Sequence, residues 1–313
     1  MEIILPFLLV ILASFFQGSF GLGMKYMEPL KWEAWWIIHV TIAMIIFPIS
    51  WAIIVVPNLF EVIGNAPKDG VFLGMLYGFL WGVGGILFGK SVPYIGLSLT
   101  YGIVMGLAAS VGSIVPLLQV EDAFSNPATN HVILAVVIML VGVALTAKAG
   151  IERDKLIGNT NDRSNISKGI MIAVSCGILS ALLNVGFANA TPVALEAEKM
   201  GALTRNSSLA GWVVVLLGAF LMNLGYAVVL LFKNKSWSSF QVPSAGNAYK
   251  WAILAGLFWF AALGIYGQGA ALMGTMGPII GWPMLLGLSL IISNIWAVRS
   301  GNGKKQKNPF NSC

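Results

Sequence analysis

The sequence predicts an all-α polytopic membrane protein, and three observations support this fold class. Of the 313 residues, 58% are hydrophobic and only 10% are charged, whereas soluble domains carry about 25% charged residues. The mean hydropathy is +0.84. Apolar runs recur along the whole chain, and many approach the roughly 20 residues that a membrane-spanning helix needs.

Nine apolar runs are long enough to be interpreted as spans. We place them at 3–23, 35–57, 70–89, 94–118, 131–147, 168–190, 208–232, 250–274 and 278–298. The first run follows Met1-Glu2 without a basic segment and continues past Gly23. We therefore expect a retained first helix and not a cleaved signal peptide.

The stretch Phe72–Leu118 holds two apolar runs joined by the polar break Lys90–Pro93. Small residues spaced four apart let helix backbones approach closely in lipid, and this spacing predicts helix packing. The glycines with this spacing are Gly74, Gly78 and Gly82, then Gly85 and Gly89, then Gly102 and Gly106.

Lys and Arg predict the orientation, because cytoplasmic loops carry an excess of both. With the N-terminus outside, 15 of the 18 basic residues fall in inner loops and three, Lys68, Lys199 and Arg205, in outer ones. We expect an integral plasma (inner) membrane protein with the N-terminus outside and a cytoplasmic tail. The formal charge of +6 is scattered through loops, so no nucleic-acid partner is expected.

The longest polar connection divides the chain into two related halves. We expect a first five-helix repeat at 1–150, a cytoplasmic linker at 151–167, a second repeat of four helices at 168–300 and a polar basic tail at 301–313. The sequence 74–77 resembles 256–259, and Tyr101-Gly102 resembles Trp282-Pro283. A repeat of five helices must be inverted in the membrane, a common plan of secondary transporters.

These motifs resemble the L-rhamnose–proton symporter family, a branch of the drug/metabolite transporter superfamily, over nearly the whole chain. The matching residues are Trp32-Glu33, Trp81–Gly84, Gly89, Tyr94–Ser98, Gly102, Gly106, Gly142–Gly150, Cys176–Ile178, Ser180, Asn189-Ala190, Pro192, Glu196, Trp259 and Tyr266. The resemblance implies ten helices in two inverted sets of five, and proton-driven uptake of a sugar, L-rhamnose. Residues 301–313 are too polar and too short for a tenth span, so the second repeat is expected to lack its last helix.

A neutral sugar needs aromatic faces for its C–H surface and amide or hydroxyl groups for its hydroxyls, in a mostly apolar pocket. The candidate substrate-binding residues within the spans are Gln17, Trp81, Tyr101, Asn184, Asn189, Trp259, Tyr266 and Gln268. Interhelical hydrogen bonding is the alternative role for the amides. Trp35, Trp36 and Trp51 lie near run ends and are expected in the interfacial aromatic belt.

Proton coupling needs a titratable group near the bundle, and no carboxylate lies in the middle of a run. His39 is one candidate because histidine titrates near neutral pH. Glu33 at the inner end of its helix and Glu196 on the outer side are the others, and we favour Glu196 over its neighbour Glu198.

Other functions remain open. The chain has neither a P-loop nor a zinc-binding motif, so we expect no enzyme, cofactor or metal. An exporter or facilitator of another small metabolite is an alternative, as is a truncated paralogue that does not transport. The sequence leaves the oligomeric state undefined. Pro278 and Pro283 interrupt the last run and are expected to break its helix.

Overall fold

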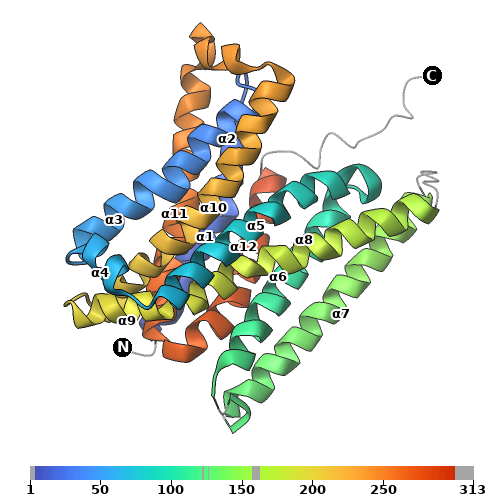
Figure 1. Cartoon of the computed structure of the whole chain (residues 1–313). Coiled ribbons are helices and arrows are strands. Elements are labelled where there is room, and N and C mark those ends of the chain that lie inside the picture. The colour runs from blue at the N-terminus through green and yellow to red at the C-terminus, as the bar shows by residue number, and fades with distance from the viewer. Residues whose placement is uncertain (1–3, 122, 126, 157–162, 300–313) are drawn as a thin grey trace, which may run out of the picture.

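The computed structural model describes the whole chain except residues 1–3, 122, 126, 157–162 and 300–313 (Figure 1). Every regular element in this described part is helical. Eight of its helical segments are long and apolar enough to cross a membrane, as expected for a polytopic membrane protein. They are Ile4–Tyr26, Trp32–Val55, Lys68–Ile95, Leu99–Gln119, Ile166–Lys199, Thr204–Asn234, Pro243–Leu272 and Gly274–Trp296.

The ninth predicted run, 131–147, lies in helix α7 (Pro127–Leu156). Within it, the described apolar stretch Thr129–Gly142 is shorter than a span. The described residues thus contain eight of the nine predicted runs as full-length candidates. The predicted linker 151–167 and tail 301–313 lie largely or wholly outside the described residues.

The helical elements divide into a first and a second half of the chain. The first half contains α1 (Ile4–Ser19), η1 (Phe20–Tyr26), α2 (Trp32–Thr41), η2 (Ile42–Ile46), α3 (Phe47–Val55), α4 (Leu59–Asn65), α5 (Lys68–Ile95), α6 (Leu97–Gln119), η3 (Ala123–Ser125) and α7. The second contains α8 (Arg163–Asn189), α9 (Thr191–Lys199), α10 (Thr204–Asn234), η4 (Trp237–Gln241), η5 (Pro243–Ala245), α11 (Gly246–Leu272), η6 (Gly274–Met276), η7 (Gly277–Gly281) and α12 (Trp282–Arg299).

The break between the third and fourth runs lies at Gly96 and not at Lys90–Pro93. Helix α5 continues through Pro93 to Ile95, and the chain turns at Gly96 with a φ of 78°, a conformation that glycine adopts without steric cost. The Ser91 hydroxyl lies 3.0 Å from that of Thr100 and donates to the Gly169 carbonyl at 3.1 Å. Ser91, which was predicted to lie in a polar break, is therefore packed between α5, α6 and α8.

Two π-helical segments accompany prolines. η2 ends two residues before Pro48, and η7 contains Pro278 and ends two residues before Pro283. Proline removes a backbone donor and clashes with the carbonyl four residues before it, and a local π turn is one way a helix accommodates this. The predicted interruption of the last run is therefore present at Pro278 as η7, whereas α12 continues through Pro283.

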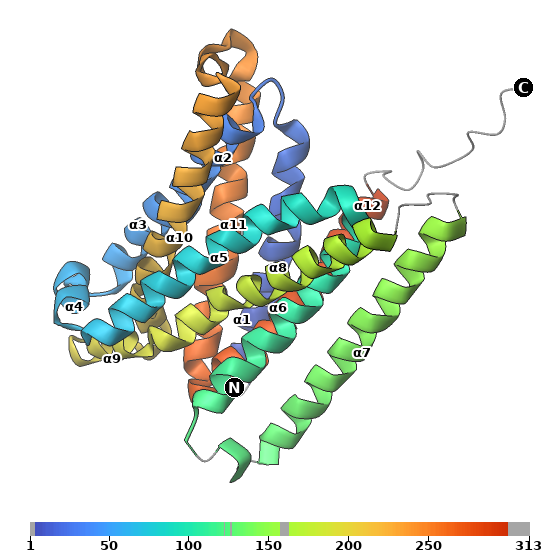
Figure 2. The same ribbon diagram turned by 45° about the vertical axis from the view of Figure 1, so that its right-hand side comes forward.

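Helix α5 lies at the centre of the packing, against α8 and α10 (Figures 1 and 2). Correspondingly, α11 packs on α1 and α2, while α6 packs on α8 and α12 packs on α1. Helix α7 packs mainly on α6 and lies at the edge of the bundle (Figure 2).

The glycine spacing predicts packing correctly on one face of α5 only. Gly74, Gly78 and Gly82 are buried, and a Cβ on Gly78 would lie 2.0 Å from the Val215 carbonyl oxygen of α10. A Cβ on Gly85 or Gly89 would meet nothing within 4 Å. The spacing alone cannot identify which row of glycines faces another helix.

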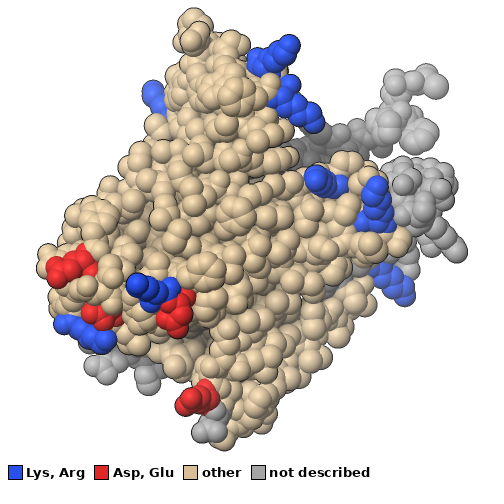
Figure 3. Space-filling view, viewed as in Figure 1, with Lys and Arg blue, Asp and Glu red and all other residues tan. Residues whose placement is uncertain are grey.

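Charge is distributed unevenly between the two ends of the bundle. The acidic side chains visible in Figure 3 lie toward the end that holds α4 and α9, with a few basic ones, while the opposite end shows basic side chains only. We call these the acidic end and the basic end. Two short helices that the sequence did not predict, α4 and α9, contact each other at the acidic end.

Candidate functional site

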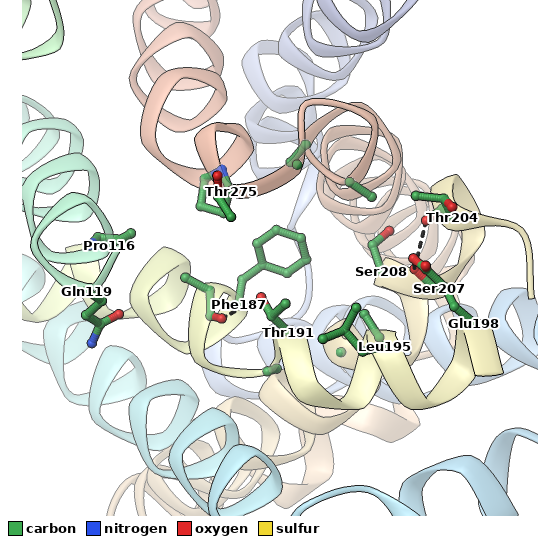
Figure 4. Close-up of a pocket in the computed structure, with 18 of the residues that line it drawn as sticks. Pro116, Gln119, Phe187, Thr191, Leu195, Glu198, Thr204, Ser207, Ser208 and Thr275 are labelled. Atoms are coloured by element: carbon green, nitrogen blue, oxygen red, sulfur yellow. Dashed lines mark hydrogen bonds between the residues drawn. The ribbon is translucent and has the colours of Figure 1, made fainter. Parts of the chain in front are cut away.

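A pocket of about 460 Å³ opens at the acidic end, beside the short helix α9 (Figure 4). We call it the α9 pocket. Its walls come from α6, the α8–α9 junction, α10, α11 and the η6–η7 break. Its polar lining residues are Gln119, Thr191, Glu198, Thr204, Ser207, Ser208 and Thr275.

Hydroxyl and carboxyl groups gather on one side of this pocket. Glu198, Ser207 and Ser208 lie together there, across from Pro116 and Gln119 (Figure 4). The Ser207 hydroxyl lies 2.9 Å from Glu198 Oε1 and 2.7 Å from the Thr204 carbonyl oxygen. The arrangement offers a sugar hydroxyl both donors and acceptors beside an apolar wall.

Phe187 is the aromatic residue that lines the pocket, and further aromatic rings pack on it. Phe187 stacks on Trp212 with ring centroids 4.4 Å apart. Tyr266 contacts Phe187 at 5.7 Å and Trp282 at 5.6 Å. Trp212 is fully buried, and its indole N–H has no hydrogen-bond partner. This is unusual, because a buried indole usually finds a hydrogen-bond partner.

Behind these rings, Asn184 joins four elements. It is fully buried, and its amide nitrogen donates to the carbonyls of Gly112 and Pro278, both at 2.8 Å. Its oxygen accepts from the Tyr266 hydroxyl at 2.6 Å. Asn184 and Tyr266, both predicted to bind substrate, thus form hydrogen bonds with other protein groups. This geometry agrees with the alternative role of the amides, which is hydrogen bonding between helices.

Two further predicted amides lie at the acidic end without lining the pocket. Asn189 donates to the Gln119 side chain at 3.2 Å and to the Val185 carbonyl at 2.8 Å. Gln268 donates to Asn206 at 3.1 Å. Through Gln119, Asn189 is one hydrogen bond from the pocket wall.

A second aromatic group surrounds Trp259, and we call Trp36, His39, Trp81 and Trp259 the Trp259 cluster. Trp81 of α5 meets Trp259 of α11, with ring centroids 5.6 Å apart. His39 lies 5.0 Å from Trp36 and 6.5 Å from Trp259. The cluster thus comes from α2, α5 and α11, and the Trp36 indole also donates to Asn223 Oδ1 of α10 at 3.1 Å.

The remaining two predicted residues have other partners. Tyr101 meets the Phe88 ring, with ring centroids 6.2 Å apart. The Gln17 side-chain oxygen is buried and has no hydrogen-bond partner. Of the eight predicted substrate-binding residues, the structure brings Trp81 and Trp259 together, and Asn184 and Tyr266 together.

One protein family matches this chain over nearly its full length. The sequence model described as L-rhamnose-proton symport protein matches residues 2–302. The chain belongs to this family. It is similar to proteins named L-rhamnose-proton symporter from Yersinia pestis (strain Pestoides F) and Yersinia pseudotuberculosis serotype O:1b (strain IP 31758). Each is 25% identical over 279 residues, covering 87% of this chain and 81% of the relative. No solved structure matches.

In this member of the L-rhamnose–proton symport family, the three predicted proton-coupling groups have different surroundings. Glu196 forms an ion pair with Lys199, with 2.8 Å between carboxylate oxygen and ammonium nitrogen. Glu33 is buried and accepts hydrogen bonds from Ser236 and, at 3.1 Å, from Asn234. His39 is 1% exposed, and its Nδ1 has no partner. None of the three lines the α9 pocket.

Sequence reasoning missed several residues that the fold places at the two sites. Trp35 and Trp36 were expected in the interfacial aromatic belt. For Trp35 this prediction is wrong, because its side chain is fully buried and stacks on His39 with ring centroids 5.2 Å apart. Asn223, a lone amide in the apolar run 208–232, was not singled out. Its type and position are the features that could have identified it, because an amide in lipid is costly without a partner. Glu198, ranked below Glu196, is the acidic residue that lines the pocket.

Proposed function

We propose that this chain is a secondary transporter that imports a sugar together with protons, with L-rhamnose as the first candidate. Membership of the symporter family, and the activity named for its relatives, carry this proposal. The α9 pocket supports it, since hydroxyl, amide and carboxyl groups line it beside the ring of Phe187, a combination that suits a neutral sugar.

We further propose that transport proceeds by alternating access. The α9 pocket opens at the acidic end, while Trp36 and His39 belong to the first turns of α2, which starts from the basic end. The ring layer of Phe187, Trp212 and Tyr266 lies behind the pocket. A rearrangement of this layer would connect a sugar in the pocket to the Trp259 cluster, and rocking of repeats is the usual means.

The inverted-repeat plan is supported by paired contacts. Counting the nine runs in order, α5 is third and α11 is eighth. Gly74 of α5 packs on Val214 of α10, and Gly256 of α11 packs on Ile42, in the second run. Exchanging the halves converts one contact into the other. We propose repeats at 1–150 and 168–300 joined by the linker 151–167, with α7 as the fifth span.

The proposed substrate-binding set keeps all eight predicted residues. Trp81 and Trp259 would stack against the sugar, and Tyr101 and Tyr266 would contribute aromatic edges and hydroxyls. Gln17, Asn184, Asn189 and Gln268 would bond sugar hydroxyls in the states in which their protein partners release them. The aromatic pair at 5.6 Å is the strongest support for a shared site.

Uptake by purified protein in liposomes tests the function. We expect labelled L-rhamnose to accumulate when the outside is more acidic, by about tenfold per pH unit for one proton per sugar. Uptake that equilibrates regardless of the pH gradient would identify a facilitator. Failure to move L-rhamnose under any gradient would contradict the proposal and leave another metabolite or a non-transporting paralogue.

The Trp259→Ala variant tests the aromatic site, with Ile253→Ala as its matched control. Removing the ring deletes the stacking surface that Trp81 shares, so sugar binding should weaken by at least about tenfold, while the protein stays monodisperse. Ile253→Ala changes a partly exposed residue on the same helix and should leave sugar affinity unchanged. Equal affinity in the Trp259→Ala variant and the wild type would remove Trp259 from the site.

The orientation is also a proposal, with the acidic end and the N-terminus outside and the basic end in the cytoplasm. We expect a cysteine placed within residues 157–161, which lie outside the described residues, to react with an impermeant reagent only after the membrane is opened. Cys176 and Cys313 should first be replaced by serine to remove background reaction. Labelling of intact cells at this position would reverse the whole orientation.

A further inference from the structure

We propose that Glu198, hydrogen-bonded to Ser207, is the group that takes up the coupled proton in the α9 pocket. This inference deepens the proposed function and rests on it. Sequence reasoning favoured Glu196, two residues earlier on the same short helix. The structure separates these two carboxylates, because Glu198 lines the pocket and Glu196 does not.

The Ser207 hydroxyl lies between two acceptors and has a single hydrogen to donate. One acceptor is Glu198 Oε1 at 2.9 Å, and the other is the Thr204 carbonyl at 2.7 Å. If Glu198 is ionised, the hydroxyl can donate to only one of them at a time. If Glu198 carries a proton, its O–H donates to Ser207 Oγ and the hydroxyl donates to Thr204. Protonation therefore satisfies every group in this chain of hydrogen bonds.

The step needs no reagent beyond a proton from the water of the open pocket. The proton binds a Glu198 carboxylate oxygen, no covalent bond to carbon changes, and the Ser207 hydroxyl turns from Glu198 to Thr204. The α9–α10 link persists with its direction reversed. The pocket side chains then carry one negative charge fewer.

That loss of charge would favour closure of the pocket. Burying an ionised carboxylate away from water is far more costly than burying a neutral carboxylic acid with a hydrogen-bond partner. A closed, sugar-filled pocket should therefore prefer protonated Glu198, and the ionised form should prefer a pocket open to water. A ligand shifts a two-state equilibrium only through such a difference in affinity, and here the ligand is the proton.

No neighbouring cation in the described part of the chain neutralises the Glu198 carboxylate in place of a proton. Glu196 and Lys199 on α9 pair with each other. The other charged residues on the elements that contact α9 near this end are Glu61 on α4, Lys68 and Asp69 at the start of α5, and Arg205 at the start of α10, all of them exposed. Within the described part of the chain, Glu198 has no cation at ion-pair distance.

The test compares Glu198→Gln with the wild type in liposomes. The amide keeps the size of the side chain and a hydrogen bond to Ser207 but cannot take up a proton. We expect Glu198→Gln to exchange L-rhamnose across the membrane in the absence of a gradient. Its accumulation under a pH gradient of one unit should fall from about tenfold to none. Proton uptake on sugar binding, followed in detergent with a pH indicator, should also disappear.

Glu61→Gln is the control carboxylate, on the neighbouring short helix and outside the pocket, and should keep full accumulation. Glu198→Asp retains a titratable group and should recover part of the coupling, which separates loss of the proton site from misfolding. Accumulation by Glu198→Gln at the wild-type level would overturn this inference while leaving the transport function intact. If Glu196→Gln alone uncouples transport, Glu196 is the site instead. A wild type that does not accumulate the sugar overturns the proposed function, and this inference with it.

Discussion

Gly218→Ala should prevent the protein from folding. A Cβ on Gly218 would lie 1.9 Å from the Met75 carbonyl oxygen of α5 and 2.7 Å from its carbon. Backbone atoms cannot turn aside as a flexible side chain can, so α5 and α10 would have to separate. The same crossing contains Gly78, whose Cβ would lie 2.0 Å from the Val215 carbonyl oxygen. We expect little or no monodisperse protein by size-exclusion chromatography of the tagged variant.

Gly225→Ala is the matched control on the same helix. A Cβ there would meet nothing within 4 Å, and alanine favours a helix over glycine by about 1 kcal/mol. This variant should express at the wild-type level with an unchanged or raised melting temperature. If Gly218→Ala behaves in the same way, α5 and α10 do not cross at these glycines.

Asn184→Ala should produce the second-largest loss, in thermal stability. The substitution leaves the carbonyls of Gly112 and Pro278 and the hydroxyl of Tyr266 without this partner. An unpaired buried polar group costs about 1–3 kcal/mol, although hydrogen bonds between membrane helices average nearer 0.6 kcal/mol. We expect the free energy of unfolding to fall by at least about 2 kcal/mol, measured by thermal or denaturant unfolding in detergent.

Tyr266→Phe separates the effect of the hydrogen bond to Asn184 from that of the aromatic contacts of Tyr266. It removes the single bond of 2.6 Å to Asn184 and keeps the contacts with Phe187 and Trp282. Its stability loss should be about 1 kcal/mol, clearly smaller than that of Asn184→Ala. Equal losses in the two variants would show that the bonds to Gly112 and Pro278 contribute nothing.

Some contacts of the candidate site could be predicted because some side chains are informative by type alone. Trp81 and Trp259 are large aromatic residues inside apolar runs, and they do meet. An amide inside a span must be bonded to something, and Asn184 is bonded three times. Its partners could not be predicted, because Gly112 and Pro278 contribute backbone carbonyls, which every residue has.

Which of Glu196 and Glu198 lines the pocket could not be predicted from the sequence. The two carboxylates are alike in chemistry and lie two residues apart on α9, so they point in different directions around that helix. Which direction faces the pocket depends on how α9 packs on α10 and α4. The short helix itself was not predicted, and with it the pairing of Glu196 to Lys199 was missed.

The sequence by itself determined the class of protein, the positions of the apolar runs and the family. These can be predicted locally, because a helix in lipid satisfies its backbone hydrogen bonds within its own segment. Only the tertiary structure decided which glycines lie at a helix crossing, where α5 ends and which acid enters the pocket. In lipid there is no hydrophobic drive to bring helices together, so close fit and a few hydrogen bonds select the contacts. That fit depends on residues far apart in the chain, such as Gly78 and Val215.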